Sequence, residues 1–70
     1  MLNNYKDLTD KIHKKFNVNL TLCKITGQRW SYVYEVGNFI HGNQKIKIND
    51  NYGLIIDCDD DTAAQVKISM

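Results

Sequence analysis

The sequence predicts an α+β fold, in which one N-terminal amphipathic helix packs on a mostly antiparallel sheet of four to five strands. Two patterns carry this prediction. Apolar residues recur at helical spacing up to residue 16, and they alternate with polar residues in most of the chain beyond it. A length of 70 residues fits a single small domain spanning 1–70. An apolar fraction of 43% and a charged fraction of 24% are typical of globular proteins.

The first element is predicted to be a helix over residues 3–16. Its apolar residues are spaced by three, four and four positions, as one face of an α-helix requires: Tyr5, Leu8, Ile12 and Phe16. Asn3 or Asn4 can cap the N-terminus of this helix through the side-chain oxygen. Asn17 can adopt the left-handed conformation that ends a helix.

Four later segments are predicted to be strands, because they alternate or are rich in β-branched and aromatic residues: 18–26, 30–36, 44–49 and 54–58. Short polar connections at 27–29 and 49–53 predict two antiparallel hairpins. The first strand is expected to be half-buried, since Val18, Leu20 and Leu22 share one side. Residues 37–43 contain two Gly and two Asn and are predicted to be a loop, with Phe39 and Ile40 pointing inward.

The last segment fits two alternatives. Residues 59–61 could cap a short helix through Ala63 and Ala64, whereas Val66 and Ile68 alternate as they would in a strand. The alternation favours the strand. With the strand, one helix of about four turns covers only part of so wide a sheet. The other face of the sheet is therefore expected to be polar or covered by a partner.

Charge and cysteine content exclude several classes of protein. Nine Lys and Arg against eight Asp and Glu give a net charge of +1, which is not the balance of a dedicated double-stranded DNA binder. No segment approaches the roughly 20 apolar residues of a membrane span, and the first residues lack the apolar run of a secretory signal. The cytoplasm is therefore the expected location, where Cys23 and Cys58 are expected to be small buried residues rather than a disulfide.

The segment 30–36 carries the main candidate binding residues. Trp30, Tyr32 and Tyr34 alternate along it, so a regular strand places three aromatic rings on one side. A row that faces the helix belongs to the core, which is the simpler interpretation. A row that faces away, flanked by Arg29, could anchor a protein partner. It could equally stack unpaired bases while lysines such as Lys45 bind phosphates.

The acidic run at 57–61 is a second candidate. It matches the first three ligand positions of a calcium loop, but Thr62 stands where that loop needs glycine and Ile68 where it needs glutamate. The run is therefore predicted to be a solvated acidic turn without a metal. Asp59, Asp60 and Asp61 are candidates for contact with a basic surface of a partner.

No catalytic constellation is evident. His13, His41, Cys23 and Cys58 lack the close spacing of a zinc site and show no sign of a nucleophile–base pair, and no cofactor motif is present. The sequence therefore predicts a non-enzymatic binding or regulatory module that docks on a protein partner, with a second copy of the chain as one candidate. A single-stranded nucleic-acid binder is the alternative. A ligand-sensing or enzymatic domain, with loop 37–43 as a pocket wall, is the third.

Overall fold

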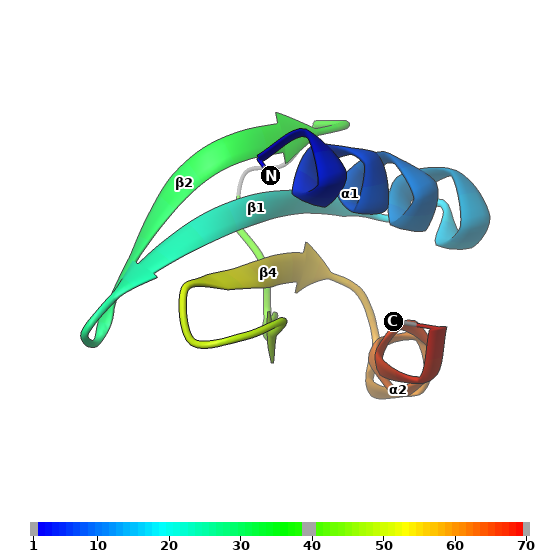
Figure 1. Ribbon diagram of the computed structural model, residues 1–70. Coiled ribbons are helices and arrows are strands. Elements are labelled where there is room, and N and C mark those ends of the chain that lie inside the picture. Colours follow the sequence, from blue (N-terminus) through cyan, green and yellow to red (C-terminus); the bar gives the residue numbers. More distant parts are fainter. Residues whose placement is uncertain (1, 39–40, 70) are drawn as a thin grey trace.

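Two helices and four strands form the part of the chain that the computed structural model describes, residues 2–38 and 41–69 (Figure 1). In chain order they are α1 (Leu2–Phe16), β1 (Asn19–Thr26), β2 (Arg29–Val36), β3 (Gln44–Lys47), β4 (Tyr52–Asp57) and α2 (Asp60–Ser69). The N-terminal helix and the four-stranded antiparallel sheet confirm the α+β class. Neither of these helices is long and apolar enough to cross a membrane.

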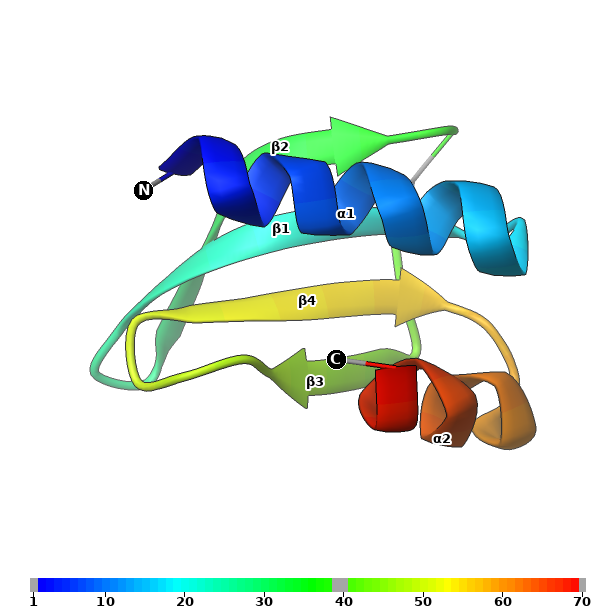
Figure 2. The same cartoon turned by 45° about the vertical axis from the view of Figure 1, so that its right-hand side comes forward.

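The strand order in the sheet is β2-β1-β4-β3, and every neighbouring pair is antiparallel. Both predicted hairpins are present, and β1 pairs with β4 between them. β2 and β3 form the two edges of the sheet, and Figure 2 shows α1 in front of β1. A Cβ atom at Gly42 would collide with the Ile55 side chain, so Gly42 lies directly against β4. The expected inward direction of Phe39 and Ile40 concerns residues outside the described ranges.

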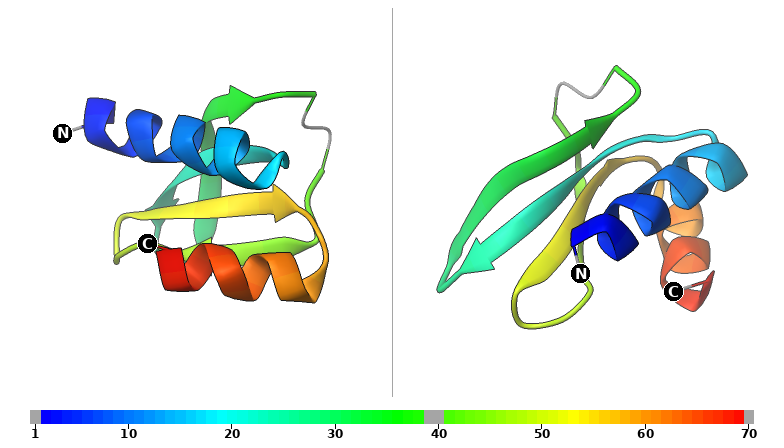
Figure 3. Two further views of the ribbon diagram at one scale, coloured as in Figure 1. Left: turned by 90° about the vertical axis from the view of Figure 1, so that its right-hand side faces the viewer. Right: turned by 45° about the horizontal axis from the view of Figure 1, so that its top comes forward.

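Both helices pack on one face of the sheet, which we call the helix side, and we call the opposite face the outer face (Figure 3). The helix-side core consists of Ile12, Val18, Leu20, Leu22, Ile46, Leu54, Ile56, Ala63 and Val66. β1 is buried on both faces. Thr21 and Cys23, which point to the face opposite Leu20 and Leu22, are also 0% exposed. The expectation of a half-buried strand is therefore wrong, because outer-face residues cover β1 as well.

Helix α1 begins one residue before Asn3, so Asn3 and Asn4 lie in its first turn and neither is the predicted cap. Capping signals in a sequence place a helix end only to within one or two residues. The C-terminal end is as predicted. Asn17 has a φ of 53°, and its backbone N–H donates to the His13 carbonyl oxygen at 2.9 Å. His13 Nδ1 in turn donates to the carbonyl oxygen of Val18 at 2.7 Å. This hydrogen bond fixes the backbone between the end of α1 and the start of β1.

The C-terminal segment is helix α2, so the favoured strand is wrong. Asp59 caps this helix, because the Thr62 backbone N–H donates to Asp59 Oδ1 at 2.8 Å. Ala63 and Val66 are three residues apart and are buried against the helix side of the sheet, whereas Ile68 is 85% exposed. The alternation of Val66 and Ile68 was therefore misleading, since only one of the two side chains reaches the core.

The cap makes α2 sensitive to acid. Hydrogen bonds from the Thr62 side chain and backbone hold the pKa of Asp59 below its usual value. A lowered folded-state pKa contributes stability above the unfolded value of about 4, and this contribution is lost as the pH falls through the folded value. We therefore expect the urea midpoint to fall between about pH 6 and about pH 3, followed by far-ultraviolet circular dichroism. Asp59→Asn, whose amide oxygen can still cap, should weaken that dependence.

The matched control is Asp61→Asn, which removes a carboxylate from the first turn of α2 and leaves the cap in place. We expect this variant to keep the pH dependence of the unsubstituted protein. Equal behaviour of the two variants would show that the Asp59 cap is not the source of the acid sensitivity.

Candidate functional site

An irregularity in the β1–β2 pairing divides the predicted aromatic row between the two faces of the sheet. Tyr34 lies opposite Leu22 and Tyr32 lies opposite Cys23, so β2 advances two residues where β1 advances one. Such a β-bulge changes the side to which the following side chains point. Tyr34 therefore shares the helix side with Leu22, whereas Trp30 and Tyr32 share the outer face with Cys23. The prediction of a single three-ring row is wrong, and a bulge of this kind needs no special residue that the sequence would reveal.

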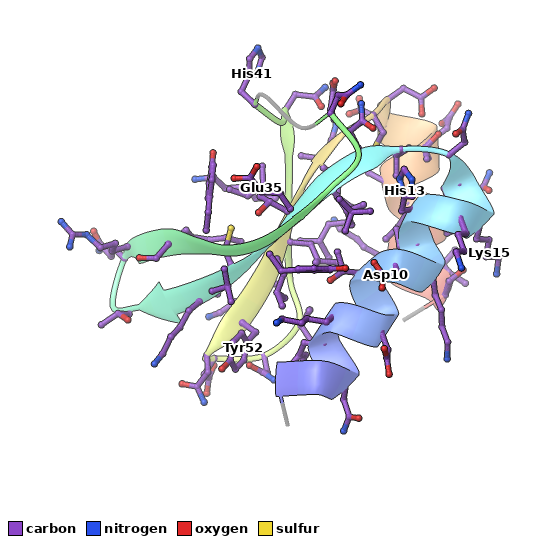
Figure 4. All side chains as sticks on the ribbon, turned by 90° about the horizontal axis from the view of Figure 1, so that it is seen from above. Asp10, His13, Lys15, Glu35, His41 and Tyr52 are labelled. Atoms are coloured by element: carbon purple, nitrogen blue, oxygen red, sulfur yellow. The ribbon has the colours of Figure 1, made fainter. Side chains whose placement is uncertain are left out.

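Tyr34 joins the sheet to α1. Its hydroxyl donates to Asp10 Oδ1 at 2.9 Å, and Lys6 Nζ lies 5.4 Å from its ring centroid. Figure 4 shows Asp10 on the side of α1 that faces the β1–β2 hairpin. The hydrogen bond to Asp10, burial, and the charges of Asp10 and Asp7 raise the pKa of Tyr34. Tyr34 therefore fixes the position of α1 and is not part of an exposed row.

Trp30 crosses the outer face from β2 to β4. It packs with Cys23 and Ile55 in a cluster separate from the helix-side core, and we call these three residues the outer cluster. A Cβ atom at Gly53 would collide with the Trp30 ring, so the ring lies directly on the β4 backbone. Lys45 Nζ lies 5.5 Å from the ring centroid, where a cation is attracted to the aromatic face.

The outer face also carries exposed side chains beside this cluster. Tyr32 is 52% exposed, and Trp30 is half-buried. Lys45 and Lys47 are exposed and lie opposite the outer-face positions of β4. Lys45 adds a positive charge, whereas Lys47 Nζ lies 3.8 Å from Asp50 Oδ1 in an exposed ion pair. We call Trp30, Tyr32, Lys45 and Lys47 the outer patch. Arg29 is the residue before Trp30 on β2, next to the β1–β2 turn. Because successive side chains of a strand point to opposite faces, Arg29 points away from the outer face and is not part of the outer patch.

The acidic candidates lie on the other side of the sheet. Asp59 caps α2, Asp60 Oδ1 accepts a hydrogen bond from Gln44 Nε2 at 2.7 Å, and Asp61 is exposed in the first turn. Because α2 packs on the helix side, the structure does not bring these residues together with the outer patch. Within residues 2–38 and 41–69, no three His, Cys, Asp or Glu side chains are placed to hold a metal ion.

Two residues of the outer face, Ile55 and Gly53, were not among the predicted site residues. The uninterrupted apolar run at 54–56 is typical of a strand buried on both faces, so it could have indicated Ile55. Gly53 was interpreted as a turn residue. Its contact with Trp30 depends on the register of two strands that are not neighbours, and no local pattern reports that register.

Both cysteines are free thiols with raised pKa values. Burial raises the pKa of Cys23 to about 11, and the charge of Lys45 offsets this only in part. Burial and neighbouring carboxylates, Asp59 foremost, raise the pKa of Cys58. Each shift lowers the thiolate fraction, whereas an activated cysteine nucleophile needs the opposite shift.

Comparisons with known protein families, with curated proteins and with solved structures find no match to this chain. The geometry and chemistry of the outer patch therefore carry the functional interpretation.

The contact between Trp30 and Gly53 can be tested by fluorescence, because Trp30 is the single tryptophan of the chain. Gly53→Ala places a Cβ where the ring lies, so we expect displacement of the ring, a red-shifted emission and a loss of about 1–3 kcal/mol in the free energy of unfolding. The same substitution in a Trp30→Ala background should cost less, because the clash with the ring is gone and only the close approach to the Ile46 carbonyl oxygen at 3.1 Å is left. An equal cost in both backgrounds, measured by urea unfolding, would contradict the assigned contact.

Proposed function

We propose that this chain is a small non-enzymatic binding module that docks on a protein partner through the outer patch. The observation that carries this proposal is the position of Trp30, which lies on the face that neither helix covers, beside a Tyr32 that is 52% exposed. Trp and Tyr are among the residue types that dominate binding free energy at protein interfaces. The charges of Lys45 and Lys47 favour a partner that surrounds an apolar contact with carboxylates.

A protein partner is better supported than single-stranded nucleic acid. A stacking platform needs ring faces that successive bases can reach. The Trp30 ring packs against Gly53 and has Lys45 over it, and Tyr34 lies on the helix side. Of the three rings in the predicted row, Tyr32 alone is well exposed. One exposed ring can stack one base, whereas a stacking platform needs several.

A different protein is also favoured over a second copy of this chain at the outer patch. A two-fold contact places the same surface of both copies face to face. That arrangement would gather Lys45 and Lys47 of both copies in one interface, and an excess of like charges at an interface is unfavourable. The proposed compartment is the reducing cytoplasm, which keeps thiols such as Cys23 and Cys58 free.

The test is a pull-down with the tagged chain from native lysate, with and without nuclease. We expect one stoichiometric protein that survives nuclease and is lost with Tyr32→Ala, whose affinity should fall about tenfold or more if Tyr32 is an anchor. The matched control is Ile68→Ala, because Ile68 is an apolar side chain that is 85% exposed on α2, away from the outer patch. This control should retain the partner, and far-ultraviolet circular dichroism should show that both variants are folded.

Two results would contradict the proposal. Recovery of nucleic acid, with the bound proteins lost on nuclease treatment, would favour the stacking alternative. Retention of the partner by Tyr32→Ala together with its loss in Ile68→Ala would move the contact to the helices. Trp30→Ala is less informative, because it also removes packing from the outer cluster.

A further inference from the structure

A cavity of about 160 Å³ opens between α1 and the C-terminal end of α2, on the helix side of the sheet. We call it the interhelix groove. It is lined by Leu8, Lys11, Ile12, Lys15, Phe16 and Ser69. Figure 3 shows the two helices side by side over the sheet. The groove therefore combines an apolar wall from α1 with two ammonium groups.

The positive charge of the groove has no ionic partner within the described residues. Lys15 Nζ lies 3.4 Å from the neutral Ser69 Oγ and 5.5 Å from the centroid of the Phe16 ring. Neither Lys11 nor Lys15 forms an ion pair with a carboxylate in that part of the chain. Lys11 and Lys15 are four residues apart, so they share one flank of α1.

Two carboxylates of the helices, Asp10 and Asp60, are engaged on other flanks, whereas Asp7 lies one turn before Lys11 on α1 and forms no ion pair with it within the described residues. Asp10 accepts the hydrogen bond of Tyr34 on the side of α1 toward β2, and Figure 4 shows Asp10 and Lys15 on opposite sides of this helix. Asp60 accepts the hydrogen bond of Gln44 on the side of α2 toward β3. Rearrangement of either carboxylate toward the groove would break a contact between a helix and the sheet.

The size of the groove selects the kind of occupant. A volume of about 160 Å³ corresponds to roughly five waters at about 30 Å³ each. Sites for drug-sized ligands are larger, at about 300–1,000 Å³. The groove therefore has room for one large apolar side chain rather than for a whole small-molecule ligand.

We infer that the interhelix groove receives a single apolar side chain from an acidic segment of a partner protein, with carboxylates of that segment paired to Lys11 and Lys15. Contact of an apolar anchor with Leu8, Ile12 and Phe16 supplies the binding free energy, and the two ion pairs set the orientation of the segment. This site lies on the opposite face of the sheet from the outer patch, so it stands or falls separately from the proposed function.

The test uses the isotopically labelled whole chain and three synthetic peptides, followed by amide chemical shifts in nuclear magnetic resonance. The first peptide has a central Phe flanked by Glu on both sides, the second replaces that Phe by Ser, and the third replaces each Glu by Lys. We expect shifts at the groove residues with the first peptide, and weakening as salt is raised. The Ser and Lys peptides should bind at least about tenfold more weakly.

The variant that tests the charge is Lys11→Glu with Lys15→Glu, which should reduce affinity for the first peptide at least about tenfold. Lys11→Gln with Lys15→Gln repeats the test without charge reversal, in case the first pair unfolds the helix. The matched control is Lys14→Glu on the same helix, since Lys14 is exposed and does not line the groove. Absence of groove shifts at millimolar peptide, equal binding of the Phe and Ser peptides, or an equal effect of Lys14→Glu would each overturn the inference.

Discussion

Strand β1 has to be covered on both faces, while the two helices cover only one of them. Leu20 and Leu22 point to the helices, and Cys23 points to a face where no helix lies. Trp30 supplies the missing cover, and its ring reaches β4 because Gly53 has no side chain to block it. The outer patch is therefore also the edge of a small second core, and the docking that we propose would use a ring on which folding also depends.

Because of the β-bulge, the aromatic residues of β2 pack on both faces of the sheet. With regular alternation Tyr34 would point to the outer face and would lose its hydrogen bond to Asp10, which is a main contact of α1 with β2. The bulge also increases local twist and interrupts the row of backbone donors and acceptors along the sheet edge. Edge pairing with another strand is thereby disfavoured, which agrees with the side-chain contact that we propose for Trp30 and Tyr32.

Local patterns in the sequence were sufficient for α1 and for the four strands, because hydrophobic period and turn residues are properties of neighbouring positions. They failed where a structure depends on distant partners. The burial of Ala63 and Val66 that makes α2 a helix needs the helix-side core to exist first. The separation of Tyr34 from Trp30 depends on the pairing of β2 with β1, and no property of residues 29–36 alone fixes that register. The sequence therefore placed the three rings on one strand but did not indicate the face to which each of them points.

Chain length links these observations. A domain of this size buries only about 60% of the surface of its unfolded chain, so its stability is small and each uncovered apolar region is a sizeable fraction of the whole. Here apolar side chains remain partly open on both faces, at Trp30 beside Tyr32 and at Phe16 in the interhelix groove. A partner that seats on either surface binds the folded state alone and therefore stabilises it by mass action. Binding at either proposed surface would for that reason be coupled to folding, and a partner that contacts both faces would enclose the sheet from two sides.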